Sequence, residues 1–242
     1  MSHPRIEAVL FDFDGTLATY RSHLGEYIAA AAEYGVTVTA EALAATLEGA
    51  WREWQTPDGV DHAVSSASEV QYNAEVRSRL HVARLAAAGA TGDLDAIAAR
   101  ICELECAPGA FEVYADTPPA LERLKAAGLR TVIVSNHVWR LPEVVDALGL
   151  GPLVDVVVTS ARAGYRKPHP AIYRIALKAA GCTPAAALFV GDSPSHDVEG
   201  PRAAGMQAVL IDRKGRYPHL EAIHRLADLD VPGLLLPASH DA

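Results

Sequence analysis

Two aspartates, Asp12 and Asp14, follow the first apolar segment of the chain at a spacing of two residues, and two more, Asp192 and Asp197, come near its other end. In an extended backbone, residues two apart point to the same side, so we expect Asp12 and Asp14 to project from one face of a strand. Carboxylates brought together repel one another, and such a group is stable when a cation lies among them, most simply oxygen-seeking Mg²⁺. The sequence therefore predicts a magnesium site if the fold unites these aspartates.

A carboxylate at such a site can also act as a nucleophile, because aspartate forms a covalent aspartyl-phosphate while a metal ion polarises a phosphoryl oxygen. A second aspartate can handle the protons. Lys167 would offset the developing negative charge. The Ser135 hydroxyl, the Asn136 amide and backbone N–H groups would hold the remaining phosphoryl oxygens. These residue types predict transfer of a phosphoryl group.

Short apolar segments precede most of these polar groups. They are too brief for helices, and in the second half of the chain they alternate with helical patterns, which is typical of a parallel sheet with crossover helices. In open α/β sheets, ligands bind beyond the carboxyl ends of the strands, where these polar side chains fall. The expected strands are residues 6–11, 129–134, 154–158, 188–190 and 208–211.

Helix boundaries are clear in the second half of the chain. Thr117 is expected to cap a helix that has Pro118 at its first position and Gly128 just beyond its end. Together with the strands, the helices predict an α/β fold with a Rossmann-like parallel sheet core and helices on both faces. Further helices are expected at about 142–149, 170–180 and 197–204.

Residues 17 to about 110 have a different composition, rich in Ala and Glu with helical spacing and without a convincing buried strand. Breaks at Gly35, at 57–59 and at 89–92 divide this stretch into several helices. We therefore expect an inserted helical domain, with residues 107–109 marking the return to the main domain.

Composition and charge narrow the class of protein. The chain has 242 residues, of which 50% are hydrophobic, enough for a sizeable core, and its net charge of −9 opposes binding to a nucleic-acid backbone. No apolar run approaches the roughly 18 to 20 residues that a membrane span needs, and the first residues lead directly into a strand. We expect a cytoplasmic protein, a monomer or homodimer, with neither a nucleic-acid nor a membrane partner.

The three cysteines do not indicate a disulfide framework, because their number is odd and no CxxC spacing occurs. Cys102 and Cys106 are four residues apart, so on a helix they would share one face and could supply half of a metal site. The simpler interpretation is that both are small apolar residues on a buried stripe.

Four motifs of this sequence resemble those of the haloacid dehalogenase-like (HAD) superfamily in their order and in their placement at strand ends. The resemblance implies that residues 1–16 and 111–242 form the catalytic core and that residues 17–110 form a helical cap of the C1 type. The motifs are Asp12-Phe13-Asp14-Gly15-Thr16-Leu17, Val134-Ser135-Asn136, Lys167-Pro168 and Gly191-Asp192-Ser193 through Asp197.

The resemblance implies catalytic and phosphate-binding roles for five residues. Asp12 matches the nucleophile and a metal ligand. Asp14 matches the general acid and base, with its backbone carbonyl on the Mg²⁺. Lys167 matches the lysine that steadies the nucleophile and the phosphoryl group, while Ser135 and Asn136 match the phosphate-binding pair.

The resemblance also implies that Asp192 and Asp197 complete the metal site. Taken singly, Asp197 could equally cap its helix, and Lys167 could be a solvated surface cation. The joint occurrence of these residues at strand ends favours the catalytic interpretation. His196 and Trp139 depart from the family pattern; we expect His196 at a helix start in solvent and Trp139 packed beneath the cap.

The activity that the resemblance implies is hydrolysis of a small phosphorylated metabolite by a Mg²⁺-dependent phosphatase. The alternative is a sugar-phosphate mutase, which uses the same two aspartates and differs in how its cap excludes water. The similar 2-haloacid dehalogenases lack a carboxylate at the place of Asp14, and the phosphonate-cleaving relatives need a cap lysine, whereas the first lysine here is Lys125. The intact set of carboxylates disfavours a non-enzymatic scaffold.

Substrate identity is expected to depend on the cap. Arg21 and His23 lie nearest in sequence to the first motif and are candidate contacts to the leaving group. His137 follows Asn136 where smaller residues are usual in the family, and is a third candidate. Other polar cap residues are Arg52, Asp58, His62 and Arg77.

Overall fold

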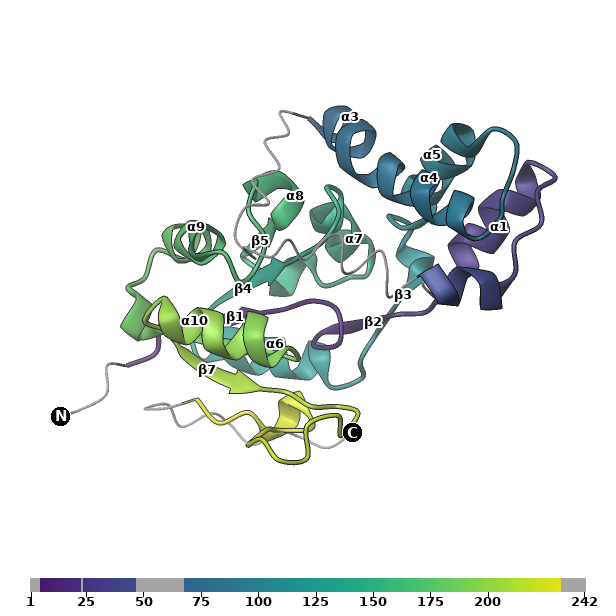
Figure 1. Ribbon diagram of the computed structural model, residues 1–242. Helices are drawn as coiled ribbons and strands as arrows, with labels where there is room; N and C mark the ends of the chain where they lie inside the picture. Colours follow the sequence, from purple (N-terminus) through teal and green to yellow (C-terminus); the bar gives the residue numbers. More distant parts are fainter. Residues whose placement is uncertain (1–4, 23, 47–67, 232–242) are drawn as a thin grey trace.

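The computed structural model describes residues 5–22, 24–46 and 68–231. Figure 1 shows a sheet flanked by helices, with a second group of helices beside it. Within the described residues, five strands form a parallel sheet in the order β5-β4-β1-β6-β7. The predicted α/β fold class and the expected strands are confirmed. The strands are β1 (Ala8–Phe11), β4 (Arg130–Ser135), β5 (Val156–Thr159), β6 (Ala187–Gly191) and β7 (Gln207–Leu210).

Helices cover both faces of this sheet. Neighbouring strand residues point to opposite faces, so Val9 packs in one apolar cluster with α6 and α7, while Leu10 packs in another with α9. Burial on both faces explains why the central strands are continuously apolar. The helices are α6 (Thr117–Ala126), α7 (Leu141–Ala147), α9 (Pro170–Ala180) and α10 (Gly200–Ala203), with the short α8 (Ser160–Ala163) after β5.

The helix boundaries agree with expectation in one case and differ in another. The expected helix 170–180 is confirmed as α9, and Gly181 ends it in the left-handed conformation. The N-cap expected at Thr117 is wrong, because Asp116 occupies that position. The Thr117 hydroxyl instead donates to the Leu17 carbonyl at 2.7 Å, which ties the start of α6 to the loop after β1.

The helical insertion is confirmed and has an apolar core of its own, built around Tyr27, Leu85 and Ile97. Its helices end at the predicted breaks at Gly35 and 89–92, while the break at 57–59 lies outside the described residues. The helices described over their whole length are α1 (Gly25–Glu33), α3 (Glu69–Tyr72), the π-helical turn η1 (Asn73–Arg77), α4 (Ser78–Ala87) and α5 (Leu94–Leu104).

A short antiparallel pair joins the insertion to the sheet domain. Strands β2 (Ala18–Tyr20) and β3 (Phe111–Val113) pair where the chain leaves the sheet domain and where it returns. We expected no convincing buried strand in residues 17–110; β2 is a strand of three residues in which Thr19 and Tyr20 are only half-buried, too short for a periodic pattern to appear. The pair lies at the predicted domain boundaries, and the division at these boundaries stays a prediction.

Two smaller expectations concern the cysteines and the membrane. Cys102 is a buried residue of α5, as the simpler interpretation predicts, whereas Cys106 lies beyond the end of that helix. In the part of the chain that the structure describes, no helix has the length and apolar character needed to cross a membrane.

Candidate active site

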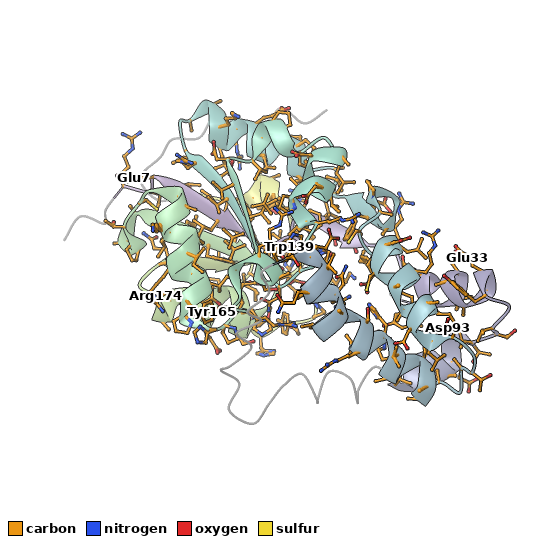
Figure 2. All side chains as sticks on the ribbon, turned by 90° about the horizontal axis from the view of Figure 1, so that it is seen from above. Glu7, Glu33, Asp93, Trp139, Tyr165 and Arg174 are labelled. Carbon is orange, nitrogen blue, oxygen red and sulfur yellow. The ribbon has the colours of Figure 1, made fainter. Side chains whose placement is uncertain are left out.

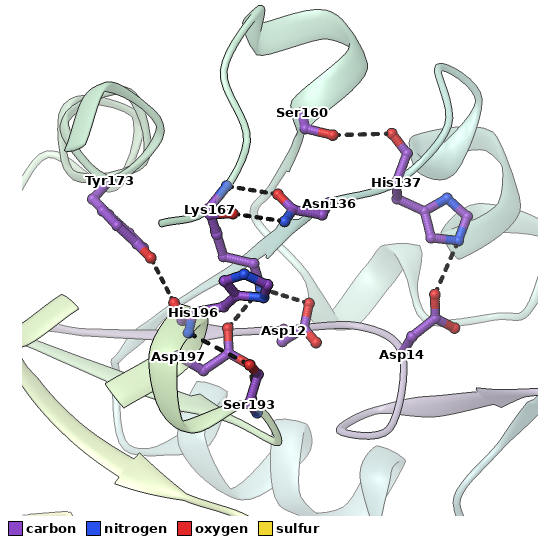
Figure 3. Close-up of polar contacts among 10 residues, drawn as sticks. All are labelled: Asp12, Asp14, Asn136, His137, Ser160, Lys167, Tyr173, Ser193, His196 and Asp197. Atoms are coloured by element: carbon purple, nitrogen blue, oxygen red, sulfur yellow. Dashed lines mark hydrogen bonds and ion pairs between the residues drawn. The ribbon is translucent and has the colours of Figure 1, made fainter. Parts of the chain in front are cut away.

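The loops after β1, β5 and β6 bring three charged side chains into contact. The Nζ atom of Lys167 lies 2.7 Å from Asp12 Oδ1 and 2.7 Å from Asp197 Oδ1, as Figure 3 shows. All three residues are buried, and Lys167 is only 4% exposed. An ammonium group shared by two buried carboxylates offsets part of their repulsion. The alternative of a solvated surface lysine is therefore wrong.

A third carboxylate joins this group from the loop after β6. Asp12, Asp192 and Asp197 each offer one oxygen, and these oxygens lie within 4.8 Å of one another. Parallel pairing of β1 with β6 places the two loops side by side. A donor set of carboxylate oxygens suits a hard divalent cation, so these residues fit the predicted Mg²⁺.

Gly15 makes the close approach of the two loops possible. Its φ of +79° is unfavourable for residues with a side chain, and a Cβ there would lie 2.1 Å from Asp192 Oδ2. The strand ends at Phe11 and the chain turns, because the Phe13 carbonyl accepts the N–H groups of residues 16–18. The extended backbone that we expected to carry Asp12 and Asp14 on one face therefore does not persist.

Burial and the nearby charge of Asp12 raise the pKa values of Asp192 and Asp197. Burial raises the pKa of Asp197 to about 7, against the opposing charge of Lys167 and with a contribution from Asp12. Burial and then the charge of Asp12 raise the pKa of Asp192. Burial would lower the pKa of Lys167, but Asp12 and Asp197 outweigh it and raise the pKa. Even with Arg216 beside Asp192, two cationic side chains face three clustered carboxyl groups, which favours a further, bound cation.

Asn136 holds the backbone of Lys167. Its Nδ2 donates to the Lys167 carbonyl at 2.9 Å, and its Oδ1 accepts the Lys167 N–H at 2.7 Å. This pair of bonds fixes the main chain from which the lysine reaches Asp12. Ser135, the last residue of β4, is 2% exposed. Contacts of Ser135 and Asn136 with phosphate stay predictions.

Asp14 lies apart from the three clustered carboxylates and faces His137. The His137 Nε2 is 3.4 Å from Asp14 Oδ2, and the Asp14 side chain is 40% exposed. Partial burial, followed by the charges of Asp12 and Asp192, raises the pKa of Asp14 to about 8. A carboxyl group with this pKa is protonated at neutral pH and can donate a proton. A metal role for Asp14 through its backbone carbonyl stays a prediction.

Asp197 does not cap its helix. The helix expected from residue 197 begins earlier, as the π-helical turn η5 (Pro194–Glu199), and Ser193 is its N-cap. The Asp197 carboxylate instead accepts the Ser193 N–H at 3.0 Å through Oδ2 and contacts Lys167 through Oδ1. His196 is half-buried rather than in solvent, and its carbonyl accepts the Tyr173 hydroxyl.

The insertion rests on the loop after β4. The ring centres of Tyr72, in α3, and Trp139 are 6.5 Å apart. Figure 2 places Trp139 where the two groups of helices meet. The Arg140 Nε lies 2.5 Å from Glu69 Oε1 across the same contact. Trp139 therefore packs beneath the insertion, as expected.

Only some of the residues that we expected to contact the substrate lie in the part of the chain that the structure describes. The Arg21 Nε donates to the Phe111 carbonyl at 3.2 Å, so this side chain lies along the β2–β3 pair. Arg77 forms an ion pair with Glu105 inside the insertion. Roles for these residues and for His137 in substrate binding stay predictions. His23, Arg52, Asp58 and His62 lie outside the described residues.

Arg216 is a site residue that the sequence did not indicate. Its Nη2 lies 2.6 Å from Asp192 Oδ2, and the Asp212 carboxylate accepts the backbone N–H groups of Arg216 and Tyr217. No motif marks this arginine, because the contact joins the loops after two neighbouring strands. Its position shortly after the fifth expected strand was the only signal available.

Comparisons with known proteins agree with this fold. The family described as haloacid dehalogenase-like hydrolase matches residues 6–205. The human haloacid dehalogenase-like hydrolase domain-containing protein 3 is 31% identical over 211 residues, covering 86% of this chain and 82% of that protein. The chain therefore belongs to the haloacid dehalogenase-like hydrolase family.

Two further relatives bear on the activity and on the fold. The phosphoserine phosphatase of Thermus thermophilus is 35% identical over 113 residues, covering 46% of this chain and 45% of that protein. The crystal structure of the HAD-hydrolase YfnB from Bacillus subtilis bound to magnesium has a TM-score of 0.71, covering 93% of this chain and 97% of that one. At 18% identity, this second likeness shows the fold alone.

Proposed function

We propose that this protein is a Mg²⁺-dependent phosphatase that releases phosphate from a small phosphorylated metabolite through a covalent intermediate on Asp12. The observation that carries the proposal is the convergence of Asp12, Asp192 and Asp197, the first and last of which share the buried ammonium group of Lys167. The likeness to a phosphoserine phosphatase supports the same class of reaction. A cytoplasmic location and a monomeric or homodimeric state are proposed from composition alone.

In the first step, an Asp12 carboxylate oxygen forms a bond to phosphorus while the bond from phosphorus to the leaving oxygen breaks. The electron pair of that bond stays on the leaving oxygen, which takes a proton from Asp14. Lys167 stays charged beside Asp12 and stabilises the negative charge of the transferring group. The three clustered carboxylates would hold Mg²⁺, which when bound supplies further positive charge to the phosphoryl oxygens.

In the second step, water attacks phosphorus and the bond to Asp12 breaks. Asp14, now a carboxylate, takes a proton from the water, and inorganic phosphate leaves with Asp12 restored. Asp14 favours this chemistry over dehalogenation, because an alkoxide leaving group needs a proton donor whereas a halide does not.

The test is phosphate release from p-nitrophenyl phosphate and from a panel of phosphorylated metabolites, with Mg²⁺ or with EDTA. Asp12→Asn should abolish turnover without changing the circular dichroism spectrum. Glu122→Gln, on the exposed face of α6, is the matched control and should keep full activity. An active Asp12→Asn enzyme would show that the nucleophile is another residue. Conversion of a sugar 1-phosphate into its 6-phosphate without phosphate release would favour the mutase.

A further inference from the structure

His137 is held rigidly beside Asp14. Its ring lies 5.7 Å from that of Phe13, nearly perpendicular to it, and 5.4 Å from that of Phe111. Both phenylalanines are almost fully buried, and the His137 side chain is 7% exposed. Phe13 directly precedes Asp14, and Phe111 begins β3. The packing therefore fixes the direction of the imidazole, and its Nε2 faces the Asp14 carboxylate.

The two carboxyl oxygens of Asp14 have different surroundings. Oδ2 faces the His137 Nε2 at 3.4 Å. Oδ1 is buried and has no hydrogen-bond partner among the residues that the structure describes. Because the Asp14 side chain is 40% exposed while Oδ1 is buried, the oxygen that an incoming substrate can reach is Oδ2. A carboxyl group turns readily about its last bond, and the contact of Oδ2 with His137 limits that rotation.

We propose that His137 is a positioning residue, which holds Oδ2 of Asp14 where it can protonate the leaving-group oxygen. This inference rests on the proposed phosphatase function, in which Asp14 is the proton donor. The proton on Oδ2 moves to the leaving oxygen as the bond to phosphorus breaks, while Oδ2 continues to accept the imidazole N–H. A separation of 3.4 Å is long for a hydrogen bond, and such contacts shorten when substrate completes a site.

The consequence is a dependence on the leaving group. An alkoxide needs the proton as it departs, so an alkyl phosphate reacts slowly when Oδ2 of Asp14 is misplaced. p-Nitrophenolate is stable as an anion, so p-nitrophenyl phosphate needs the proton much less. A residue with a merely structural role would change both rates alike.

The experiment compares kcat for glycerol 2-phosphate and for p-nitrophenyl phosphate. His137→Phe keeps an aromatic ring between Phe13 and Phe111 but removes the N–H group. It should lower kcat for the alkyl phosphate about tenfold or more, and kcat for the aryl phosphate by less than about twofold. His137→Gln carries an N–H group close to the place of Nε2 and should recover most of the loss. His219→Phe, an exposed histidine, is the matched control and should change neither rate.

Two results would overturn the inference. An equal loss for both substrates would make His137 a structural residue. A further loss when His137→Phe is added to Asp14→Asn would show that the histidine does not act through Asp14. If His137→Phe does not fold, Phe111→Leu loosens the same ring and should give a smaller loss of the same selective kind. Failure of the phosphatase proposal is separately visible, as wild-type protein that releases no phosphate in Mg²⁺.

Discussion

Replacement of Gly15 by alanine is expected to damage the metal site by a collision in addition to backbone strain. At a φ of +79°, a residue with a side chain loses about 1–2 kcal/mol. The new Cβ would also lie 2.1 Å from Asp192 Oδ2 and 2.7 Å from its Cγ. Restoring an ordinary contact of 3.4 Å moves the oxygen by about 1.3 Å. This displacement carries Asp192 out of its place among the three clustered carboxylates.

Gly89→Ala is the matched control. Gly89 has a φ of +83°, and a Cβ there would meet nothing within 4 Å. Both variants should lose about 1–2 kcal/mol of unfolding free energy from the backbone conformation, measured by urea denaturation and circular dichroism. Gly15→Ala should lose roughly 1–3 kcal/mol more of unfolding free energy, which is the usual effect of forcing extra atoms into a packed site.

Mg²⁺ affinity, measured by isothermal titration calorimetry, separates the two variants. Gly15→Ala should bind the ion about 10- to 100-fold more weakly, as is typical when the support of a metal ligand is disturbed. Gly89→Ala should bind it as the wild type does. Equal Mg²⁺ affinity and equal unfolding free energy for the two variants would refute the reasoning, because glycine at 15 would then serve only the backbone conformation.

Three further predictions follow from charges and pKa shifts. Lys167→Met leaves Asp12 and Asp197 buried without their cation and should cost about 3–5 kcal/mol of unfolding free energy in EDTA. Because unpaired buried carboxyls bind protons more tightly when folded, the stability of this variant in urea denaturation should fall more steeply with rising pH than that of the wild type, in which the pKa values of Asp14 and Asp197 are already raised; equal slopes would contradict this. Burial lowers the pKa of His81 below 6.5, and Arg77 and His81 together hold the pKa of Glu105 below 4.5 against the opposing effect of burial. At these two groups the unfolded chain binds more protons, so each lowers stability as pH drops, His81 below 6.5 and Glu105 below 4.5. The melting temperature of the wild type should therefore fall relative to that of His81→Gln as pH drops below 6.5, and an unchanged difference would contradict this origin. Removal of metal with EDTA should end phosphate release and added Mg²⁺ should restore it, whereas a rate indifferent to EDTA would exclude a metal requirement.

The sheet could be predicted because its strands satisfy a local rule. Segments such as 8–11, within the predicted strand 6–11, and 188–190 are apolar throughout, since α6, α7 and α9 cover both faces of the sheet. The polar residues that end these segments then fall at one edge of a parallel sheet. The group formed by Asp12, Asp192 and Asp197 was predicted on this reasoning, and the structure confirms that these carboxylates meet.

Other features escaped prediction because they depend on contacts between distant segments. The three-residue strand β2 is stable only when paired with β3, which lies at the far end of the insertion. Thr117 has the side chain of a good helix cap, yet its hydroxyl bonds the Leu17 carbonyl instead. Arg216 reaches Asp192 only because β6 and β7 are neighbours in the sheet.

The sequence by itself determined the fold class and the chemical inventory of the site, because periodicity and residue type at strand ends follow from local physical rules. The tertiary structure alone decided which atoms meet. Asn136 forms two hydrogen bonds with the backbone of Lys167. The turn that follows β1 places Asp14 beside His137 instead of among the three clustered carboxylates. These contacts depend on how the loops run after each strand ends. Packing and hydrogen bonds between distant segments determine the course of these loops, and no periodic pattern in the sequence indicates it.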